Sequence, residues 1–313
     1  MKTGIICADG IGDAIILSIL VHQANSYSNV TLFHSKAAFL STLFPFFDIQ
    51  TLPPLETLQK YDELILQNDH SEKAFHLYSA RKKGLLSHLK ILFPTESKME
   101  KMEGDFNCDP KESFTNEVKK ARFFFFPSKP LSPLFQISST SYRKEEKKVA
   151  IHPLSADPKR NWPKKKYLSL ADALKKKGYT PVFIMSEKER ESFGEIPFEI
   201  FSSLDLNDFA KKISSCGFFI GNDSAFGHLA SCCRIPTLTI SGNKKRVKRW
   251  RPDFFIGEVV YPLLPLPNFK GIQTKFFDGR VRDNYWQNFL SVSKVVKRFH
   301  NLVKNFEKLK EDS

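Results

Sequence analysis

Three short stretches of the sequence combine glycine, acidic and basic residues that could bind a charged ligand or move a proton. They are ADGIGD (8–13), ADPKRNWP (156–163) and GNDSAFGHLA (221–230). Each comes shortly after an apolar run that is typical of a buried strand, and each leads into a helical pattern. The sequence therefore predicts three turns between a strand and a helix, with polar groups at each turn.

The first stretch has two glycines, Gly10 and Gly12, before Asp13. Glycines allow a tight turn and a close approach of the backbone to a ligand. A dinucleotide-binding turn needs a third glycine three positions after the second, where this chain has Ile15. An NAD-type site is therefore disfavoured, and this motif alone favours a structural role for Asp13, as a carboxylate that caps free N–H groups at a helix start.

The second stretch places Lys159 and Arg160 immediately before a helix that is expected to begin at Pro163. Cations beside the free N–H groups of a helix start suit a phosphate or a diphosphate. A solvated basic turn is the alternative, because three lysines follow at 164–166. Trp162 is interpreted as a packing anchor.

The third stretch is the most specific of the three. Asp223, Ser224 and the N–H groups that follow them are predicted at the carboxyl end of a strand and the start of a helix, where open α/β sheets bind phosphate-bearing ligands. His228 comes five positions after Asp223, so simple helical spacing does not let the two share a metal ion. A hydrogen bond to substrate and a buried structural role both remain open for this histidine.

Apolar runs and helical patterns alternate along the chain, which indicates an α/β fold with open parallel sheets. The polar stretch at 138–148 resembles a linker, after which the alternation starts again. Four phenylalanines at 123–126 are expected to form a strand or part of an apolar groove, and the spacing from Phe289 to Phe306 predicts a long amphipathic helix. The expected strands lie at 2–8, 30–33, 63–67, 149–154, 180–185, 198–201, 217–221 and 237–240.

Composition narrows the class of protein without choosing a function. The 313 residues carry a formal charge of +14 and five cysteines without regular ligand spacing, and no apolar run reaches the length of a membrane-spanning helix. Reduced thiols, the absence of a signal-peptide pattern and the absence of a spanning run predict a cytoplasmic protein. The charge attracts nucleotides, nucleic acid or an anionic membrane surface, but no nucleic-acid-binding module is recognisable, so no specific nucleic-acid partner is expected.

A basic run near residue 250 leaves two interpretations open. It consists of Lys244, Lys245, Arg246, Lys248, Arg249 and Arg251. Such a run either approaches anionic lipid at the cytoplasmic face of the inner membrane, as a peripheral contact, or forms a solvated loop.

Four motifs in the same order resemble glycosyltransferase family 9, the heptosyltransferases, over nearly the whole chain. They are GIGDAIILSIL near the start, IHPLSADPKRNWP, the looser FIMSEKER, and DSAFGHLASCCRIPTLTISG. Ala225 stands where the family usually has glycine, and this methyl group would be costly if the backbone there required a positive φ. No motif for the acceptor is recognised in the first half of the chain.

The resemblance implies a GT-B fold, with two Rossmann-like domains that face a central cleft. We expect an acceptor-binding domain at 1–145, a nucleotide-sugar-binding domain at 146–288, and a C-terminal helix at 289–313 that crosses back to the first domain. The implied reaction is metal-independent transfer of a sugar with inversion, most simply of heptose from ADP-heptose to a lipopolysaccharide-core hydroxyl. The nucleotide sugar is then a co-substrate, and no cofactor is expected.

The resemblance also assigns roles to residues. Asp13 is the expected general base, with Gly10 and Gly12 on the acceptor side, and no metal ligand is expected because the chain has no Asp-x-Asp motif. The donor is expected to contact a set of residues in the second domain, with Arg160 on the diphosphate and Glu189 on the ribose. This set comprises Lys159, Arg160, Glu189, Asp223, Ser224, Ala225 and His228.

Other functions remain open. A degenerate transferase that binds a nucleotide sugar without turnover would explain Ala225. A transferase that uses a different donor or a protein acceptor is equally compatible with these motifs.

Overall fold

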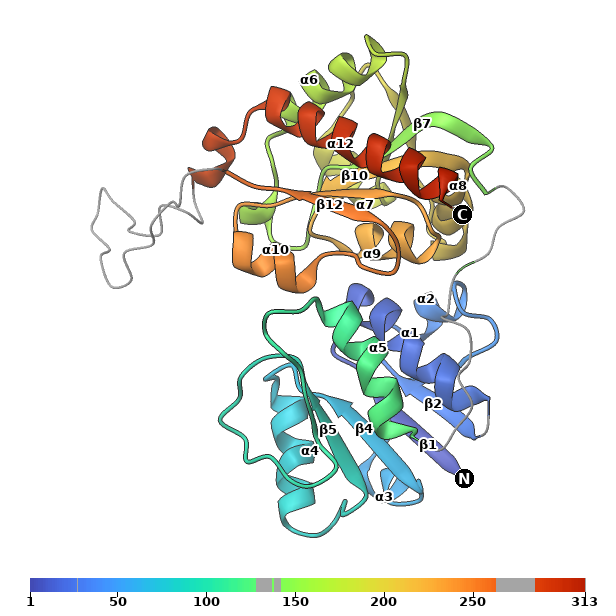
Figure 1. The fold of residues 1–313 in the computed structure, drawn as a ribbon. Coiled ribbons are helices and arrows are strands. Elements are labelled where there is room, and N and C mark those ends of the chain that lie inside the picture. Colours follow the sequence, from blue (N-terminus) through green and yellow to red (C-terminus); the bar gives the residue numbers. More distant parts are fainter. Residues whose placement is uncertain (27, 128–136, 138–141, 263–284, 313) are drawn as a thin grey trace. The chain divides into compact units, whose positions relative to one another are not determined.

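The computed structural model describes residues 1–26, 28–127, 137, 142–262 and 285–312. Contacts within the chain divide it into two compact units, one of residues 1–135 with 205–207 and one of residues 136–204 with 208–313. Each unit contains a six-stranded parallel sheet with helices packed around it (Figure 1). None of the helices in the described part of the chain combines the length and the apolar character needed to cross a membrane.

In the first unit the strand order is β3-β2-β1-β4-β5-β6, so the chain builds outward from β1 on one side and then returns to β1 on the other. Strands β1 and β4 are neighbours that are not consecutive, and the gap beyond their carboxyl ends is where open α/β sheets bind ligands. The strands are β1 (Lys2–Ile6), β2 (Asn29–Phe33), β3 (Asp48–Gln50), β4 (Glu63–Gln67), β5 (Leu89–Phe93) and β6 (Phe106–Asn107). The helices are α1 (Ile11–Asn25), α2 (Ala37–Ser41), α3 (Leu55–Leu58), α4 (Glu72–Lys82) and α5 (Phe114–Phe125).

The second unit repeats this topology, with the order β12-β11-β10-β7-β8-β9 and the corresponding switch between β7 and β10. Its strands are β7 (Glu145–His152), β8 (Thr180–Ile184), β9 (Glu199–Phe201), β10 (Cys216–Asn222), β11 (Thr237–Ile240) and β12 (Gly257–Val260). Its α-helices are α6 (Lys164–Lys175), α7 (Glu187–Phe193), α8 (Leu206–Ser215), α9 (Ala225–Cys232), α10 (Lys244–Trp250) and α12 (Val292–Glu311). The described residues of this unit also form the 3-10 turns η1 (Pro158–Arg160) and η2 (Trp286–Phe289).

Burial explains why these sequences form these elements. The central strands are buried on both faces, as parallel strands covered by helices must be, and they therefore appear in the sequence as continuous apolar runs. Helix α1 is buried almost all round because it packs against β1, β2 and α5. The predicted C-terminal helix is α12, which buries Phe299, Leu302 and Phe306 and packs on α6, β11 and β12.

Two sequence predictions need correction. The four phenylalanines at 123–126 do not form a strand, because α5 continues to Phe125 and Phe126 follows it as a buried residue. The predicted linker at 138–148 extends too far, because β7 begins at Glu145 and pairs along its length with β8 and β10. The first residues of that stretch, 138–141, lie outside the described residues. Charged side chains at 145–148 obscured the strand in the sequence, since its first three residues are exposed.

Candidate functional site

The second unit brings two of the three motif stretches to the same place. β7 leads into the segment with Lys159 and Arg160, and its neighbour β10 leads into Asp223. The carboxyl ends of these strands lie at the topological switch point of the sheet. A pocket of about 530 Å³ opens there. It is lined by Asp157, Lys159, Arg160, Asp223, Ile240, Ser241, Gly242, Asn243, Arg246 and Trp286.

One acidic residue lies between two guanidinium groups in this pocket. The Asp223 side chain is only 10% exposed, and its Oδ2 lies 3.6 Å from Nη1 of Arg160. The same oxygen accepts a hydrogen bond from Nε of Arg246 at 3.0 Å. Asp157 also approaches Arg160, with 3.7 Å from its Oδ2 to Nε. The cations that line the pocket are Lys159, Arg160 and Arg246, so three positive charges face two negative ones.

The loop that carries the first two cations is fixed from both sides. Asp157 caps the 3-10 turn by accepting the N–H of Lys159 at 3.0 Å. The indole N–H of Trp286 donates to the Lys159 carbonyl at 3.0 Å. This indole packs so closely on Gly242 that a Cβ there would lie 2.2 Å from the ring, so position 242 requires glycine. The basic turn is therefore held in place.

Asn222, which the sequence analysis did not select, organises this junction. It is buried at the end of β10, and its Oδ1 accepts the N–H of Trp162 at 3.2 Å and the hydroxyl of Tyr167 at 2.9 Å. Its Nδ2 donates to the Pro153 carbonyl at 2.5 Å. The asparagine thus ties the two switch-point loops together. An amide beside Asp223 at a predicted strand end was the available signal for such a role.

Helix α9 starts immediately after this junction, with Ser224 as its N-cap. Its first N–H groups belong to the residues that follow Asp223 and Ser224 in the chain, and Asp223 itself lines the pocket. Ala225 is the first helical residue and is absent from the described non-glycine residues with positive φ. The energetic cost that a positive φ would impose on alanine at this position therefore does not arise. The serine hydroxyl is buried and has no hydrogen-bond partner among the described residues.

The first unit brings Asp13 to its own switch point. Asp13 lies in the first turn of α1, and its Oδ1 accepts a hydrogen bond of 2.6 Å from Nε2 of Gln67 at the end of β4. Oε1 of the same glutamine amide in turn accepts the N–H of Ala8 at 3.3 Å. The other Asp13 oxygen lies against Gly10, where a Cβ would be 2.3 Å away. A side chain at position 10 would therefore displace the Asp13 carboxylate from its observed position.

Comparison with known proteins now decides the family. The model of glycosyltransferase family 9 (heptosyltransferase) matches residues 70–253, more than half of the chain. The chain belongs to glycosyltransferase family 9. The matched segment includes both switch-point loops of the second unit and excludes the Gly10–Asp13 turn. Among curated protein sequences, none matches this chain.

Solved structures show the same fold at low identity. ADP-heptose LPS heptosyltransferase II of E. coli is 15% identical with a TM-score of 0.65, and the match covers 98% of this chain and 100% of that one. A family 9 glycosyltransferase from Veillonella parvula is 14% identical with a TM-score of 0.66, covering 97% of each chain. E. coli heptosyltransferase WaaC with ADP is 11% identical with a TM-score of 0.61, covering 96% and 100%. The predicted GT-B fold is confirmed.

Not every residue that was predicted to bind the donor lines this pocket. Glu189 is half-buried and forms a capping box at the start of α7, where one oxygen accepts the N–H and the hydroxyl of Ser186, each at 2.8 Å. Its other oxygen lies 3.8 Å from Nε2 of the buried His152 at the end of β7. A structural role thus occupies part of this carboxylate, and Glu189 does not line the pocket that holds Arg160.

His228 is buried within α9 and likewise does not line that pocket. Burial lowers the pKa of its imidazole, although the charge of Asp223 and a hydrogen bond to the Trp250 backbone act in the opposite direction. Its Nδ1 has no hydrogen-bond partner in the part of the chain that the structure describes. The geometry therefore favours a neutral, buried histidine.

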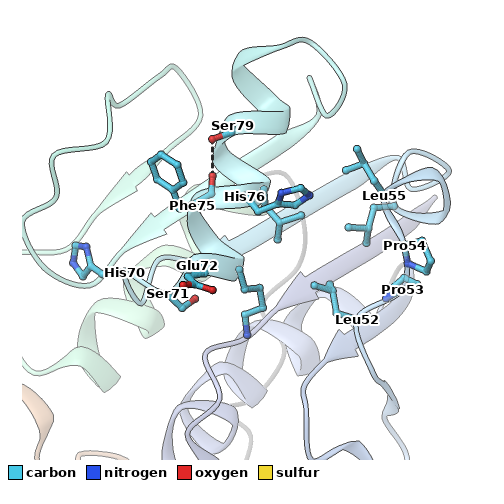
Figure 2. A pocket seen from close by; sticks show the side chains of 13 residues that line it. Leu52, Pro53, Pro54, Leu55, His70, Ser71, Glu72, Phe75, His76 and Ser79 are labelled. Carbon is cyan, nitrogen blue, oxygen red and sulfur yellow. Dashed lines mark hydrogen bonds between the residues drawn. The ribbon is translucent and has the colours of Figure 1, made fainter.

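A second pocket, of about 880 Å³, lies in the first unit between residues 52–58 and helix α4. Figure 2 shows Phe75 and His76 on the helix and Leu52 to Leu55 on the other side. Lys73 connects it to the Gly-Asp turn, because its Nζ donates to the Cys7 carbonyl at 2.8 Å and lies 3.2 Å from Asp9. None of the three motif stretches lines this pocket.

Metal ligation has no candidate cluster among the described residues. No group of three or more histidine, cysteine, aspartate or glutamate side chains there could hold an ion. The sequence prediction of metal independence stays a prediction.

Proposed function

We propose that this family 9 glycosyltransferase transfers a sugar, with inversion, from a nucleoside diphosphate sugar to an acceptor hydroxyl. The observation that carries the proposal is that one pocket at the β7–β10 switch point is lined by Lys159, Arg160 and Asp223, the last of which directly precedes the N-cap of α9. Cations and helix N–H groups together suit a diphosphate. The donor is taken to be ADP-heptose, supported by family membership and by the similarity to structures of heptosyltransferases, one of them with ADP.

The chemistry needs a proton acceptor and a stabilised leaving group. As the acceptor oxygen attacks the anomeric carbon, the bond from that carbon to the diphosphate oxygen breaks, which inverts the configuration. The hydroxyl proton passes to the Asp13 carboxylate, which Gln67 holds at the switch point of the first unit. The ADP leaves with its developing charge opposite Arg160, Lys159 and the N–H groups of α9.

The two units divide these tasks in the proposal. Residues 146–288 bind the donor, residues 1–145 supply the base and bind the acceptor, and a lipopolysaccharide core is the proposed acceptor. Under this proposal the protein works in the cytoplasm at the inner leaflet, where lysines on α10 are exposed toward solvent. The ordinary helical backbone at Ala225 removes the main argument for a degenerate, non-catalytic protein.

Thermal stability in the presence of ADP tests the donor site. A ligand that binds only the folded protein raises the melting temperature, so ADP is expected to do so. Arg160→Ala should reduce this increase, because it removes a guanidinium from the pocket. Lys165→Ala is the matched control, since Lys165 is an exposed neighbour with the same charge. Equal increases in the parent and in Arg160→Ala would exclude Arg160 from the diphosphate site.

Sugar transfer with a panel of ADP- and UDP-sugars tests the activity itself. Turnover of ADP-heptose is expected, and binding without turnover of any donor would contradict the proposal. Mass spectrometry of lipopolysaccharide from a strain that lacks this chain then identifies the acceptor through the missing residue.

A further inference from the structure

The basic run near residue 250 forms helix α10, and its cations are not equivalent. Val247 and Arg249 are buried and fix the helix, while Lys244, Lys245 and Lys248 are exposed to solvent. Arg246 differs from its lysine neighbours because its guanidinium reaches Asp223, with 3.0 Å between Nε and Oδ2. The sequence analysis interpreted the run as a single surface feature, whereas in the structure one of its cations, Arg246, lines the candidate donor pocket.

Arg160 and Arg246 present more hydrogen-bond donors than the pocket uses. Each guanidinium has five N–H donors. Among the described residues, the Arg246 side chain donates one hydrogen bond, to Asp223, and the Arg160 side chain has only ion pairs of 3.6 and 3.7 Å. The two side chains are 44% and 29% exposed, so an incoming ligand can reach them.

We propose that Arg246 is a second diphosphate-binding residue and that the pair of Arg160 and Arg246 selects a diphosphate over a monophosphate. Asp223 holds both guanidinium groups at one carboxylate oxygen, which orients them before a ligand arrives. Two planar forks can each engage one phosphoryl group, so a ligand with a single phosphoryl group uses only one of them. This inference rests on the proposed donor site and identifies Arg246 as the residue that distinguishes a diphosphate from a monophosphate.

The test measures binding of ADP, AMP, inorganic pyrophosphate and inorganic phosphate by calorimetry to the full chain. Arg246→Gln should weaken ADP and pyrophosphate by about 10- to 100-fold, as expected for lost hydrogen bonds between charged groups, and leave AMP within about threefold. Arg246→Lys keeps the charge without the fork, so an intermediate loss is expected. Lys245→Gln removes the same charge from the same helix at an exposed position and should change each affinity by about twofold or less.

Several results would overturn the inference. An equal loss of ADP affinity in Arg246→Gln and Lys245→Gln would show that the loss comes from the lower positive charge of the helix and not from a specific contact of Arg246. An equal loss for ADP and AMP would place Arg246 away from the second phosphoryl group. An unchanged melting temperature without ligand shows that a variant is folded. If Arg246→Gln is not folded, Arg246→Lys is used for the same comparison.

Pyrophosphate separates this inference from the proposed function. If the parent binds pyrophosphate through Arg246 but does not bind ADP, the arginine pair stands and the choice of nucleotide fails. If the parent binds ADP and only the Arg246 variants behave like the control, the donor site stands and the role of Arg246 fails. If the parent binds neither, both fail.

Discussion

Asp13 combines a position in a helix start with the role of general base that we propose for it. It lies in the first turn of α1, where a carboxylate favours the helix, and it accepts a short hydrogen bond from Gln67 across the switch point. A helix-capping role alone does not require a partner from β4. The contact with Gln67 fixes the orientation of the carboxylate, as a general base requires.

Asp13→Asn separates catalysis from structure. Asparagine keeps an oxygen for the Gln67 amide and also favours a helix start, but it cannot take the acceptor proton. We expect a folded protein that binds ADP like the parent and whose turnover is reduced by roughly 10²–10⁴-fold. Turnover above about a tenth of the parental rate would show that Asp13 is not the base, and His228 would be tested next.

Gln67→Met tests the positioning of that base. Methionine has a similar length but donates no hydrogen bond, so Asp13 loses the partner that stabilises its ionised form. We expect kcat to fall by about 10-fold, on the scale of one hydrogen bond to a charged group, and the acid limb of the pH–rate profile to move to higher pH. A loss of stability with an unmoved pH profile would leave Gln67 with a structural role only.

At the scale of elements, both candidate sites depend on loops that follow neighbouring strands which are not consecutive in the chain. Asn222 at the end of β10 satisfies the Trp162 N–H, the Tyr167 hydroxyl and the Pro153 carbonyl, all of which are contributed by the β7–α6 region. Because these groups are buried, they have little access to water if the amide is removed.

Asn222→Ala should therefore destabilise the second unit by about 2–4 kcal/mol, since it leaves several buried polar groups unpaired. Denaturant unfolding measures this loss. Asn305→Ala is the control, because Asn305 is exposed on α12 and, among the described residues, its side chain bonds only Glu258. This variant should change stability by at most about 0.5 kcal/mol. Similar values for the two variants would contradict the proposed role of Asn222 in holding the loops.

At the scale of the whole molecule, three histidines are buried at the carboxyl edges of the sheets or just beyond them. They are His34, His152 and His228, and burial lowers the pKa of each. Unfolding exposes these imidazoles and lets them bind protons that the folded chain excludes. The contribution of these neutral imidazoles to the free energy of unfolding is therefore fully present above about pH 6.5, the ordinary histidine pKa. It is lost as the pH falls below that value.

We expect the melting temperature to decrease by at least about 3 °C between pH 7.5 and 5.5, measured by circular dichroism. Carboxylates with lowered pKa, such as Glu145 and Glu199, act only at more acidic pH, because their ordinary pKa is near 4.3. His152→Gln should flatten the pH dependence, and His76→Gln, at an exposed position, should leave it unchanged. An equal slope in all three proteins would exclude buried histidine as the cause.

The sequence by itself determined the fold class, most strands and the three motif turns. Strands such as β4 and β11 were predicted at their observed bounds, because a strand buried on both faces must be a continuous apolar run. It also predicted Lys159, Arg160 and Asp223 as donor-binding residues, because charged groups at a turn between a strand and a helix suit a phosphate. These signals are local, because each strand or turn can be recognised from the residues of its own short segment.

Tertiary structure decided which of these residues meet. Gln67 reaches Asp13 across 54 positions and Arg246 reaches Asp223 across 23, and neither contact has a periodicity or a motif that the sequence could reveal. Glu189 lies in a helix cap and His228 on a buried helix face, so neither lines the pocket that holds Arg160, and their roles as donor ligands stay predictions. The physical reason is that a parallel sheet places the carboxyl ends of neighbouring strands side by side, β4 beside β1 and β11 beside β10, so the strand order, and not the spacing along the chain, sets which residues meet.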